Sequence, residues 1–320
     1  MINAFQVSKV GNTPTLVKIG LSAPKASEVL ISIEACGLNF ADLLMAKGTY
    51  QDTPPAPFTL GMEVCGRVLA HGTDTTSPAI GSRVAVFGGQ GGLAEQGIFP
   101  ADLCIPIPDQ MPAEVAAGFM VAYGTSHMAL TRRAALMPGE TLLVFGAAGG
   151  VGLTAIEIGK ALGARVIAVA RGASKLAVAQ AAGADHLLDS DTDDIIAAVK
   201  ALGGADVVYD PVGGELFKAA MKVANREARI ITIGFASGDV PQIPANILLV
   251  KNITVIGFYW GGYLHFNTPA LKDSMAELMQ MYSDGRLRPE VRHVFPLAQA
   301  QDALDLLEQR KSTGKVVVTM

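Results

Sequence analysis

The 320-residue sequence contains little cysteine. Its three cysteines, Cys36, Cys65 and Cys104, are widely separated and form no Cys-x-x-Cys pair. This excludes a disulfide scaffold and a cysteine-rich metal lobe, because each needs several thiols at characteristic spacings. Free cysteines also indicate a reducing compartment, so we expect a cytoplasmic protein.

Long uncharged apolar stretches and an excess of either charge are absent too. No such stretch approaches the roughly 20 residues of a membrane-spanning helix, and we expect no membrane span. The 25 basic and 29 acidic residues give a net charge of −4, which provides no electrostatic footprint for nucleic acid or an anionic membrane. The start, MINAFQVSKVGN, lacks a basic segment followed by an apolar one, so we expect no secretory signal.

The chain is organised around the stretch from Leu142 to Ala170. An apolar run meets Gly146, Gly149, Gly150 and Gly152, and a helical pattern and a second apolar run follow. Glycines at such a turn let a diphosphate approach the backbone N–H groups at the start of the helix. An ordinary glycine-rich turn is the alternative in a chain with 35 glycines. The flanking strand and helix patterns favour a dinucleotide site.

The end of the second apolar run bears on which dinucleotide is used. A site for NAD usually carries an acid about 20 residues beyond the glycines, but no acidic residue occurs between Glu157 and Asp185. The segment ARGASK offers Arg171, Ser174 and Lys175 instead. These side chains can bind a ribose 2′-phosphate, so the sequence favours NADPH. The alternative is that both cations are merely solvated.

Residues 1 to about 118 are rich in β-prone runs separated by Gly, Pro, Asn and Asp. The runs are Ala4–Val7, Leu16–Ile19, Glu28–Glu34, Val64–Ala70 and Arg83–Phe87. They predict a partly closed antiparallel barrel. Between the third and fourth runs we expect one helical turn at Asp42–Met45, followed by a proline-rich loop.

From about Glu114 apolar strands alternate with helices, which predicts βαβ units and a parallel sheet. Strands are expected at 142–145, 166–170, 186–188, 207–209, 229–233 and 253–258, and helices at 174–182, 195–201, 216–223, 269–284 and 297–310. A last strand at 315–319 returns the chain to the first domain. The predicted domains are therefore 1–118 with 262–320, and 119–261.

Several motifs together carry a family resemblance. They are NFADLLMAKGTY, PFTLGMEVCGRV, AYGTSHMAL, GAAGGVG, VVYDPVGG and STGKVVV, in this order along the chain. The sequence resembles the quinone oxidoreductase branch of the medium-chain dehydrogenase/reductase superfamily. The resemblance implies a GroES-like distorted barrel plus a doubly wound Rossmann domain, NADPH, and reduction of quinones or α,β-unsaturated carbonyls. It also implies a homodimer, paired through Thr254–Phe258.

The zinc-dependent members of that superfamily provide a contrast. The positions that match their catalytic ligands are Asn39, Met62 and Ala117, and none is a plausible ligand, since zinc takes thiolate, imidazole or carboxylate. Without a metal, charge developing on the oxygen of an isolated ketone is poorly stabilised. Conjugated acceptors spread that charge, so we expect quinones or enones as substrates.

Two residues are candidate catalytic groups. Asn39 is polar within an apolar run and is predicted to contact the nicotinamide ribose or the substrate; a loop hydrogen bond is the alternative. Tyr50 could donate a proton or hydrogen bond to the substrate oxygen; the alternatives are that Tyr50 is an ordinary half-buried packing residue and that solvent supplies the proton. Asp42 is expected to cap or brace the loop. Glu63 is expected to be structural, paired with an arginine.

The remaining predicted site residues surround the cofactor. They are Thr125, Gly146, Ala148, Gly149, Gly150, Val151, Arg171, Ser174, Lys175, Val212, Gly234, Phe235, Phe258, Trp260 and Lys315. The alternative role for Thr125 is N-capping of a helix. Trp260 and Tyr259 are expected to form an aromatic wall for a flat quinone, and the alternative is that they are ordinary packing residues. Lys315 is expected near Asn39 or the cofactor. The predicted function is a zinc-free NADPH:quinone or enone reductase; the alternatives are an enoyl-thioester reductase and an NADPH-binding protein with little turnover.

Overall fold

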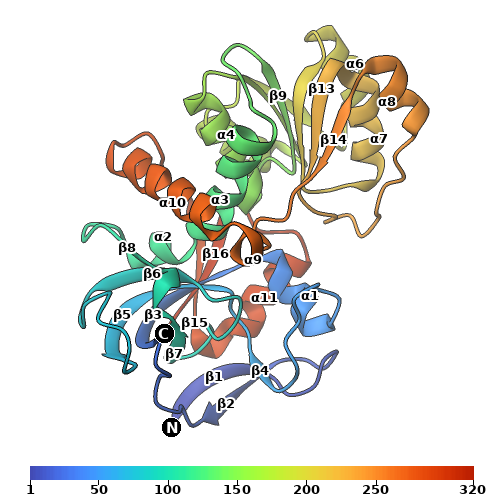
Figure 1. The fold of residues 1–320 in the computed structure, drawn as a ribbon. Helices are drawn as coiled ribbons and strands as arrows, with labels where there is room; N and C mark the ends of the chain where they lie inside the picture. The colour runs from blue at the N-terminus through green and yellow to red at the C-terminus, as the bar shows by residue number, and fades with distance from the viewer. The chain divides into compact units, whose positions relative to one another are not determined.

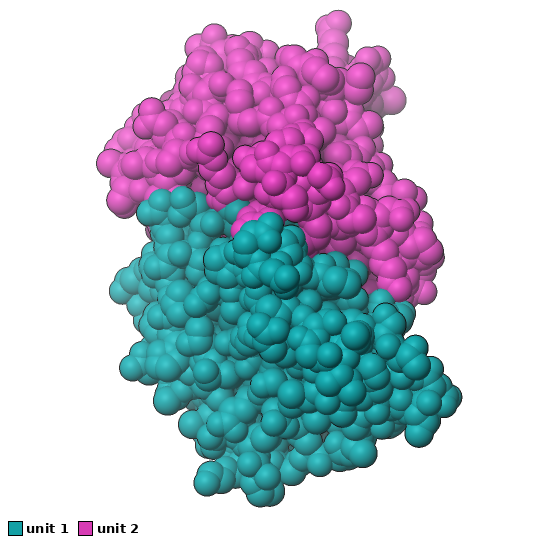
Figure 2. Space-filling view, turned by 90° about the vertical axis from the view of Figure 1, so that its left-hand side faces the viewer, with its two compact units in different colours: residues 1–121, 289–320 teal, residues 122–288 magenta.

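The computed structural model describes all 320 residues (Figure 1). It divides into two compact units, residues 1–121 with 289–320 and residues 122–288, which Figure 2 shows in teal and magenta. These units differ from the predicted domains mainly in residues 262–288, which group with the second unit. The domain limits drawn from the sequence remain a prediction.

The first unit is built on two sheets. A three-stranded sheet has the order β2-β1-β4, and a larger sheet has the order β15-β16-β3-β5-β6-β8, with β7 also paired to β3. The strands are β1 (Ile2–Val7), β2 (Thr15–Ile19), β3 (Glu28–Leu38), β4 (Phe58–Thr59), β5 (Glu63–His71), β6 (Arg83–Phe87), β7 (Gln96–Pro100), β8 (Cys104–Pro106), β15 (Val291–Pro296) and β16 (Lys315–Thr319).

Strand β3 is the centre of the larger sheet. Its side chains alternate between buried and half-buried from Glu28 to Ala35, as expected for a strand with one face on the core. The C-terminal strand β16 lies antiparallel to its end, with Val316 opposite Leu38 and Val318 opposite Cys36. This register brings Lys315, the first residue of β16, beside the point where β3 ends.

Helices of the first unit join and cover these strands. They are α1 (Phe40–Lys47), α2 (Ala113–Ala117) and α11 (Ala300–Glu308), with 3₁₀ turns at Ala101–Leu103 and Leu297–Gln299. Helix α3 (Met120–Met128) begins in the first unit and continues into the second, and a π-helical turn follows it at Ala129–Arg133.

The second unit contains a six-stranded sheet of order β11-β10-β9-β12-β13-β14 in which all neighbours are parallel. This is the strand order of the doubly wound dinucleotide-binding fold. The strands are β9 (Thr141–Phe145), β10 (Arg165–Ala170), β11 (His186–Asp189), β12 (Ala205–Asp210), β13 (Ala224–Thr232) and β14 (Thr254–Gly257). The predicted parallel sheet is confirmed.

Helices lie on both faces of this sheet. In Figure 1, α4 lies on one side, and α6, α7 and α8 lie on the other. The helices are α4 (Gly150–Ala161), α5 (Ala173–Ala181), α6 (Ile195–Ala201), α7 (Gly214–Val223), α8 (Ala245–Lys251), α9 (Tyr263–Phe266) and α10 (Thr268–Ser283). Phe217 of α7 packs with Leu143 and Phe145 of β9 in a fully buried core.

Some predicted boundaries were wrong. The helical turn at Asp42–Met45 is part of the longer α1, and the helix expected at 297–310 is a 3₁₀ turn followed by α11. Strands β4, β7, β8 and β15 and helices α2, α8 and α9 were not predicted. Strand β15 alternates half-buried and exposed residues and ends in proline, so its sequence carries too weak an apolar signal.

Candidate functional site

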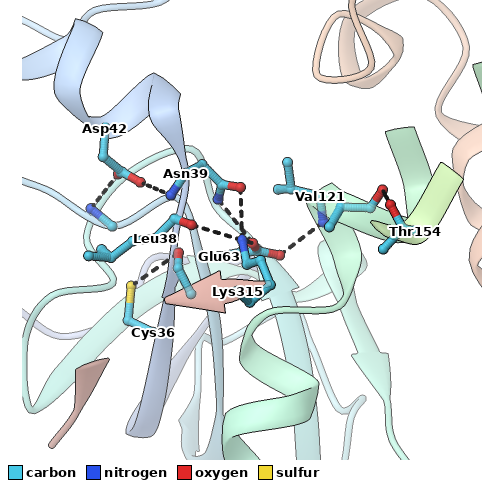
Figure 3. Close-up of polar contacts among 11 residues, drawn as sticks. Cys36, Leu38, Asn39, Asp42, Glu63, Val121, Thr154 and Lys315 are labelled. Atoms are coloured by element: carbon cyan, nitrogen blue, oxygen red, sulfur yellow. Dashed lines mark hydrogen bonds and ion pairs between the residues drawn. The ribbon is translucent and has the colours of Figure 1, made fainter. Parts of the chain in front are cut away.

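A polar cluster lies where β3 ends, and Figure 3 shows its members. The Lys315 ammonium donates hydrogen bonds to the Leu38 carbonyl (2.9 Å), to Asn39 Oδ1 (2.9 Å) and to Glu63 Oε1 (2.6 Å). Asn39 Nδ2 donates to the same oxygen of Glu63 at 2.9 Å. Strands β3, β5 and β16 therefore bring together three side chains from distant parts of the chain.

The ion pair in this cluster is buried. The side chains of Lys315 and Glu63 are 9% and 1% exposed. Several atoms of the Lys315 stem lie 3.2 to 3.3 Å from where a Cβ on Gly118 would be, so glycine there makes room for the lysine. Removing either partner would leave an uncompensated charge in the interior, which is strongly destabilising.

Lys315 thus lies next to Asn39, one of the two positions expected for it; its contact with a cofactor remains a prediction. The expected pairing of Glu63 with an arginine was wrong, because Glu63 pairs with Lys315. The error has a physical reason: the pairing depends on the register of β16 against β3, which the sequence around Glu63 does not encode.

The second oxygen of Glu63 faces the start of a helix. Glu63 Oε2 accepts a hydrogen bond from the backbone N–H of Val121, the second residue of α3 (2.9 Å). A carboxylate at a helix N-terminus satisfies an otherwise unpaired N–H and interacts favourably with the helix dipole. Both oxygens of Glu63 are therefore engaged.

Asp42 braces the same loop, as expected. Its carboxylate accepts hydrogen bonds from the backbone N–H groups of Asn39 (2.8 Å) and Gly61 (3.1 Å), which ties the start of α1 to the segment before β5. Burial raises the pKa of Asp42 from 3.8 to about 6, although these two hydrogen bonds and nearby Lys315 oppose the rise. Asn39 itself is the N-cap residue of α1.

Tyr50 lies in the turn that follows α1, where its carbonyl accepts a hydrogen bond from Thr53 (2.7 Å). Asn39 precedes the same eight-residue helix, which is about 12 Å long at 1.5 Å per residue. The two predicted catalytic residues are therefore at opposite ends of α1, and the role of each remains a prediction.

The positions that match the ligands of catalytic zinc are unsuited to a metal. Met62 and Ala117 are buried apolar residues, and Asn39 Oδ1 is occupied by the Lys315 ammonium. Across the chain no group of three or more His, Cys, Asp or Glu side chains is placed to hold a metal ion.

No helix of the structure has the length and apolar character that crossing a membrane requires.

The glycine turn of the second unit follows β9. Gly146 adopts φ +58°, a conformation that favours glycine. A Cβ on Gly152 would lie 2.3 Å from the Gly146 carbonyl oxygen, and one on Gly149 would lie 3.3 Å from it, so the turn and the first turn of α4 pack backbone against backbone. Helix α4 has Gly149 as its N-cap and no acidic residue in its first turn. This cradle suits a diphosphate; Gly150 and Val151 begin the helix, and Ala147 and Ala148 complete the turn.

The basic residues after β10 have acidic neighbours that the sequence reasoning missed. Arg171 Nε pairs with Asp191 Oδ1 at 3.1 Å, and Asp189 accepts a hydrogen bond from the Gly172 N–H at 3.0 Å. Partial burial and nearby Arg171 lower the pKa of Lys175, so the two cations lie close enough to repel each other. Ser174 lies in the first turn of α5 between them in sequence.

Three other predicted cofactor residues follow the ends of strands β12 and β13. Val212 follows β12, and its N–H donates to Asp210 Oδ1 at 2.8 Å. Gly234 and Phe235 follow β13, and the Phe235 side chain is exposed. Asp210 is a buried residue that sequence reasoning missed; it shapes the loop through the N–H groups of Val212 and Gly213.

The aromatic residues after β14 are largely packed. The Trp260 indole is 3% exposed and lies against Gly124, where a Cβ would come within 2.6 Å of it. Thr125, the next residue of α3, is buried as well. The Phe258 ring is buried and contacts the Tyr263 ring at 5.9 Å between centroids. Tyr259 is the more accessible neighbour of Trp260.

A unit of mostly antiparallel sheets that carries a polar cluster, together with a doubly wound parallel sheet that carries a glycine cradle, defines a dehydrogenase-type fold for dinucleotides. Family models agree: the alcohol dehydrogenase GroES-like domain matches residues 25–109, and the zinc-binding dehydrogenase domain matches residues 150–282. The chain belongs to the medium-chain dehydrogenase/reductase superfamily, in its quinone oxidoreductase-like branch. The predicted fold class is confirmed.

Individual relatives are similar along nearly the whole chain. Quinone oxidoreductase-like protein 2 of Bos taurus is 40% identical over 297 residues, which cover 92% of this chain and 85% of the relative. The synaptic vesicle membrane protein VAT-1 homolog of Homo sapiens is 31% identical over 314 residues, covering 92% and 80%. The solved structure of Escherichia coli quinone oxidoreductase complexed with NADPH matches with a TM-score of 0.91 at 27% identity, covering 99% and 100%.

Asp42 provides a pH test of the cluster. Because its pKa is higher in the folded chain, between about pH 4 and 6 the folded state binds more protons than the unfolded state, and stability falls as the pH rises. This contribution totals on the order of 3 kcal/mol. We expect urea unfolding to show the wild type losing stability relative to Asp42→Asn from pH 4 to 7.

Asp74→Asn, which removes one carboxylate from an exposed loop of the same unit, is the control for the loss of a negative charge. A constant difference between wild type and Asp42→Asn across this range would contradict the raised pKa.

Proposed function

We propose that the protein is an NADPH-dependent, zinc-free reductase of quinones or α,β-unsaturated carbonyl compounds. The observation that carries the proposal is the pair of sites already described. One is the glycine cradle followed by Arg171, Ser174 and Lys175 without an acid at the end of β10. The other is the Asn39–Glu63–Lys315 cluster where a metal ligand would otherwise be.

The cradle and the basic segment have separate tasks in binding. The start of α4 accommodates the diphosphate, because its N-cap is glycine and its first turn has no acid. Arg171 and Lys175 offer charge-assisted hydrogen bonds to a 2′-phosphate, and Ser174 offers its hydroxyl. NADPH supplies a hydride when bound, and the protein supplies orientation and hydrogen-bond donors.

The polar cluster determines which acceptors suit the site. Asn39 can donate a hydrogen bond to the substrate or to the nicotinamide ribose, but an amide is a weaker stabiliser of an alkoxide than a metal ion. In a quinone or enone, hydride adding to the conjugated carbon spreads the charge toward the oxygen, so a few donors suffice. Tyr50 or solvent is the proposed proton source.

A second candidate function is NADPH binding with little turnover. It is favoured by the similarity to a relative whose name describes a synaptic vesicle membrane protein rather than an enzyme. It predicts tight NADPH binding without oxidation by any acceptor.

Steady-state assays distinguish these candidates. We expect NADPH oxidation with quinones or enones, less than about 1% of that rate with saturated ketones because their charge stays on one oxygen, and no loss of rate with a chelator. An enoyl thioester tests the remaining alternative. Chelator-sensitive oxidation of alcohols would contradict the zinc-free proposal, and tight NADPH binding without turnover would favour the second candidate.

Cofactor preference tests the basic segment. In Arg171→Ala/Lys175→Ala we expect the Kd for NADPH to rise about 10- to 100-fold, since charged hydrogen bonds are worth roughly 1.5–3 kcal/mol, while the Kd for NADH changes little. Fluorescence titration measures both. Arg226→Ala, an exposed arginine of the same unit, is the control. Equal losses for the two cofactors would show that this segment does not read the 2′-phosphate.

We also propose a cytoplasmic homodimer. Strand β14 is the outer strand of its sheet, with Thr254 and Gly257 exposed, and α8 exposes Leu249 and Val250. An unpaired strand edge and exposed apolar side chains favour association with a second copy. Sedimentation should give about twice the 33.3 kDa of one chain. A single 33.3 kDa species at all concentrations would contradict the dimer.

A further inference from the structure

We propose that Glu63 and Lys315 are positioning residues that determine which edge of the Asn39 carboxamide is accessible. This inference rests on the proposed function, in which Asn39 contacts the substrate or the cofactor. It assigns a role to Glu63, which the sequence indicates only as structural, and it gives Lys315 an action through Asn39 rather than through direct contact.

The two charges determine the orientation of the amide. An ammonium can only donate hydrogen bonds, so the Asn39 atom 2.9 Å from Lys315 Nζ is the carbonyl oxygen. A carboxylate only accepts them, so the atom 2.9 Å from Glu63 Oε1 is the amide nitrogen. In a flipped amide the NH₂ group would face the ammonium and the oxygen would face the carboxylate, and both contacts would be repulsive.

The number of N–H groups on Lys315 and Asn39 shows which of the two can donate to a substrate. Lys315 has three N–H groups, and they meet three acceptors at 2.6 to 2.9 Å, on Leu38, Asn39 and Glu63. It has no further hydrogen to offer to a substrate unless one of these bonds breaks. Asn39 Nδ2 has two hydrogens, of which Glu63 takes one. Because Asn39 is half-buried, its second N–H is the donor that this cluster can present.

The positioning residues are themselves held. Glu63 Oε2 accepts from the Val121 N–H at the start of α3, so the carboxylate cannot rotate without losing that bond. The backbone N–H of Asn39 is held by Asp42. Asn39 is therefore restrained at its backbone and at both polar atoms of its side chain, which is the preorganisation that a fixed donor needs.

The charge-neutral double variant Glu63→Gln/Lys315→Met tests the proposal. Replacing both ions of a buried pair is much less destabilising than removing one, so we expect urea unfolding near that of the wild type. With its oxygen toward the Val121 N–H, the new glutamine would turn its NH₂ group toward Asn39 and favour the flipped amide. We expect kcat/KM to fall about 10- to 100-fold. Asn39→Ala should lower the same parameter.

A double-mutant cycle and a spectrum complete the test. In the Asn39→Ala background the two substitutions should cost little more, because they act through Asn39. In the protein without cofactor, the ¹⁵N side-chain amide resonance of Asn39, assigned by its loss in Asn39→Ala, should shift in the double variant. Glu34→Gln, which weakens the ion pair with Arg83 at 3.3 Å in the same unit, should leave both readouts unchanged.

The outcomes are separable. Wild-type kcat/KM with an unmoved amide resonance in the double variant would overturn the proposal, as would losses that multiply fully with Asn39→Ala. If the wild type reduces no acceptor, the proposed function fails, and the amide resonance alone decides whether Glu63 and Lys315 position Asn39.

Discussion

The buried ion pair between Lys315 and Glu63 is the interaction on which the first unit's polar cluster depends. A lysine and a glutamate so far from water are stable only while each compensates the other and their remaining hydrogen-bonding positions are filled. Leu38 and Asn39 fill the positions on the ammonium, and Val121 fills one on the carboxylate. One pair therefore connects the end of β3, the start of β5, the start of β16 and the first turn of α3.

The positive ends of three helices, α1, α3 and α4, differ in whether a carboxylate of the protein lies at them. Asp42 lies in the first turn of α1, and Glu63 accepts from the first turn of α3, so each of these helices has a carboxylate of the protein at its positive end. Helix α4 instead begins with glycines and has no acid in its first turn. The positive end left without a protein carboxylate is the one suited to an anionic ligand.

The balance between acidic and basic side chains also matters at the end of β10 in the second unit. The end of β10 lacks the acid that would select against a 2′-phosphate, but Asp189, the last residue of β11, and Asp191, in the loop after β11, approach the same segment. Arg171 and Asp191 are both largely exposed, so their pairing is weak and screened by solvent. A 2′-phosphate carries more charge than one aspartate and can compete with this pairing, so the neighbouring aspartates are compatible with the proposed NADPH site.

Periodicity and glycine placement in the sequence determined the parallel sheet and the helix after Gly149, because these are local patterns that backbone geometry requires. The absence of an acid at the end of β10 could be read directly from the residues. The sequence also indicated Asn39 and Lys315 as candidate site residues and predicted that Asp42 caps or braces its loop. Only the tertiary structure decided that Glu63 pairs with Lys315, that Asp191 reaches Arg171, and that Trp260 packs on Gly124. Each of these contacts depends on strand register or on loops meeting across the fold, and neighbouring residues along the chain carry no information about such distant partners.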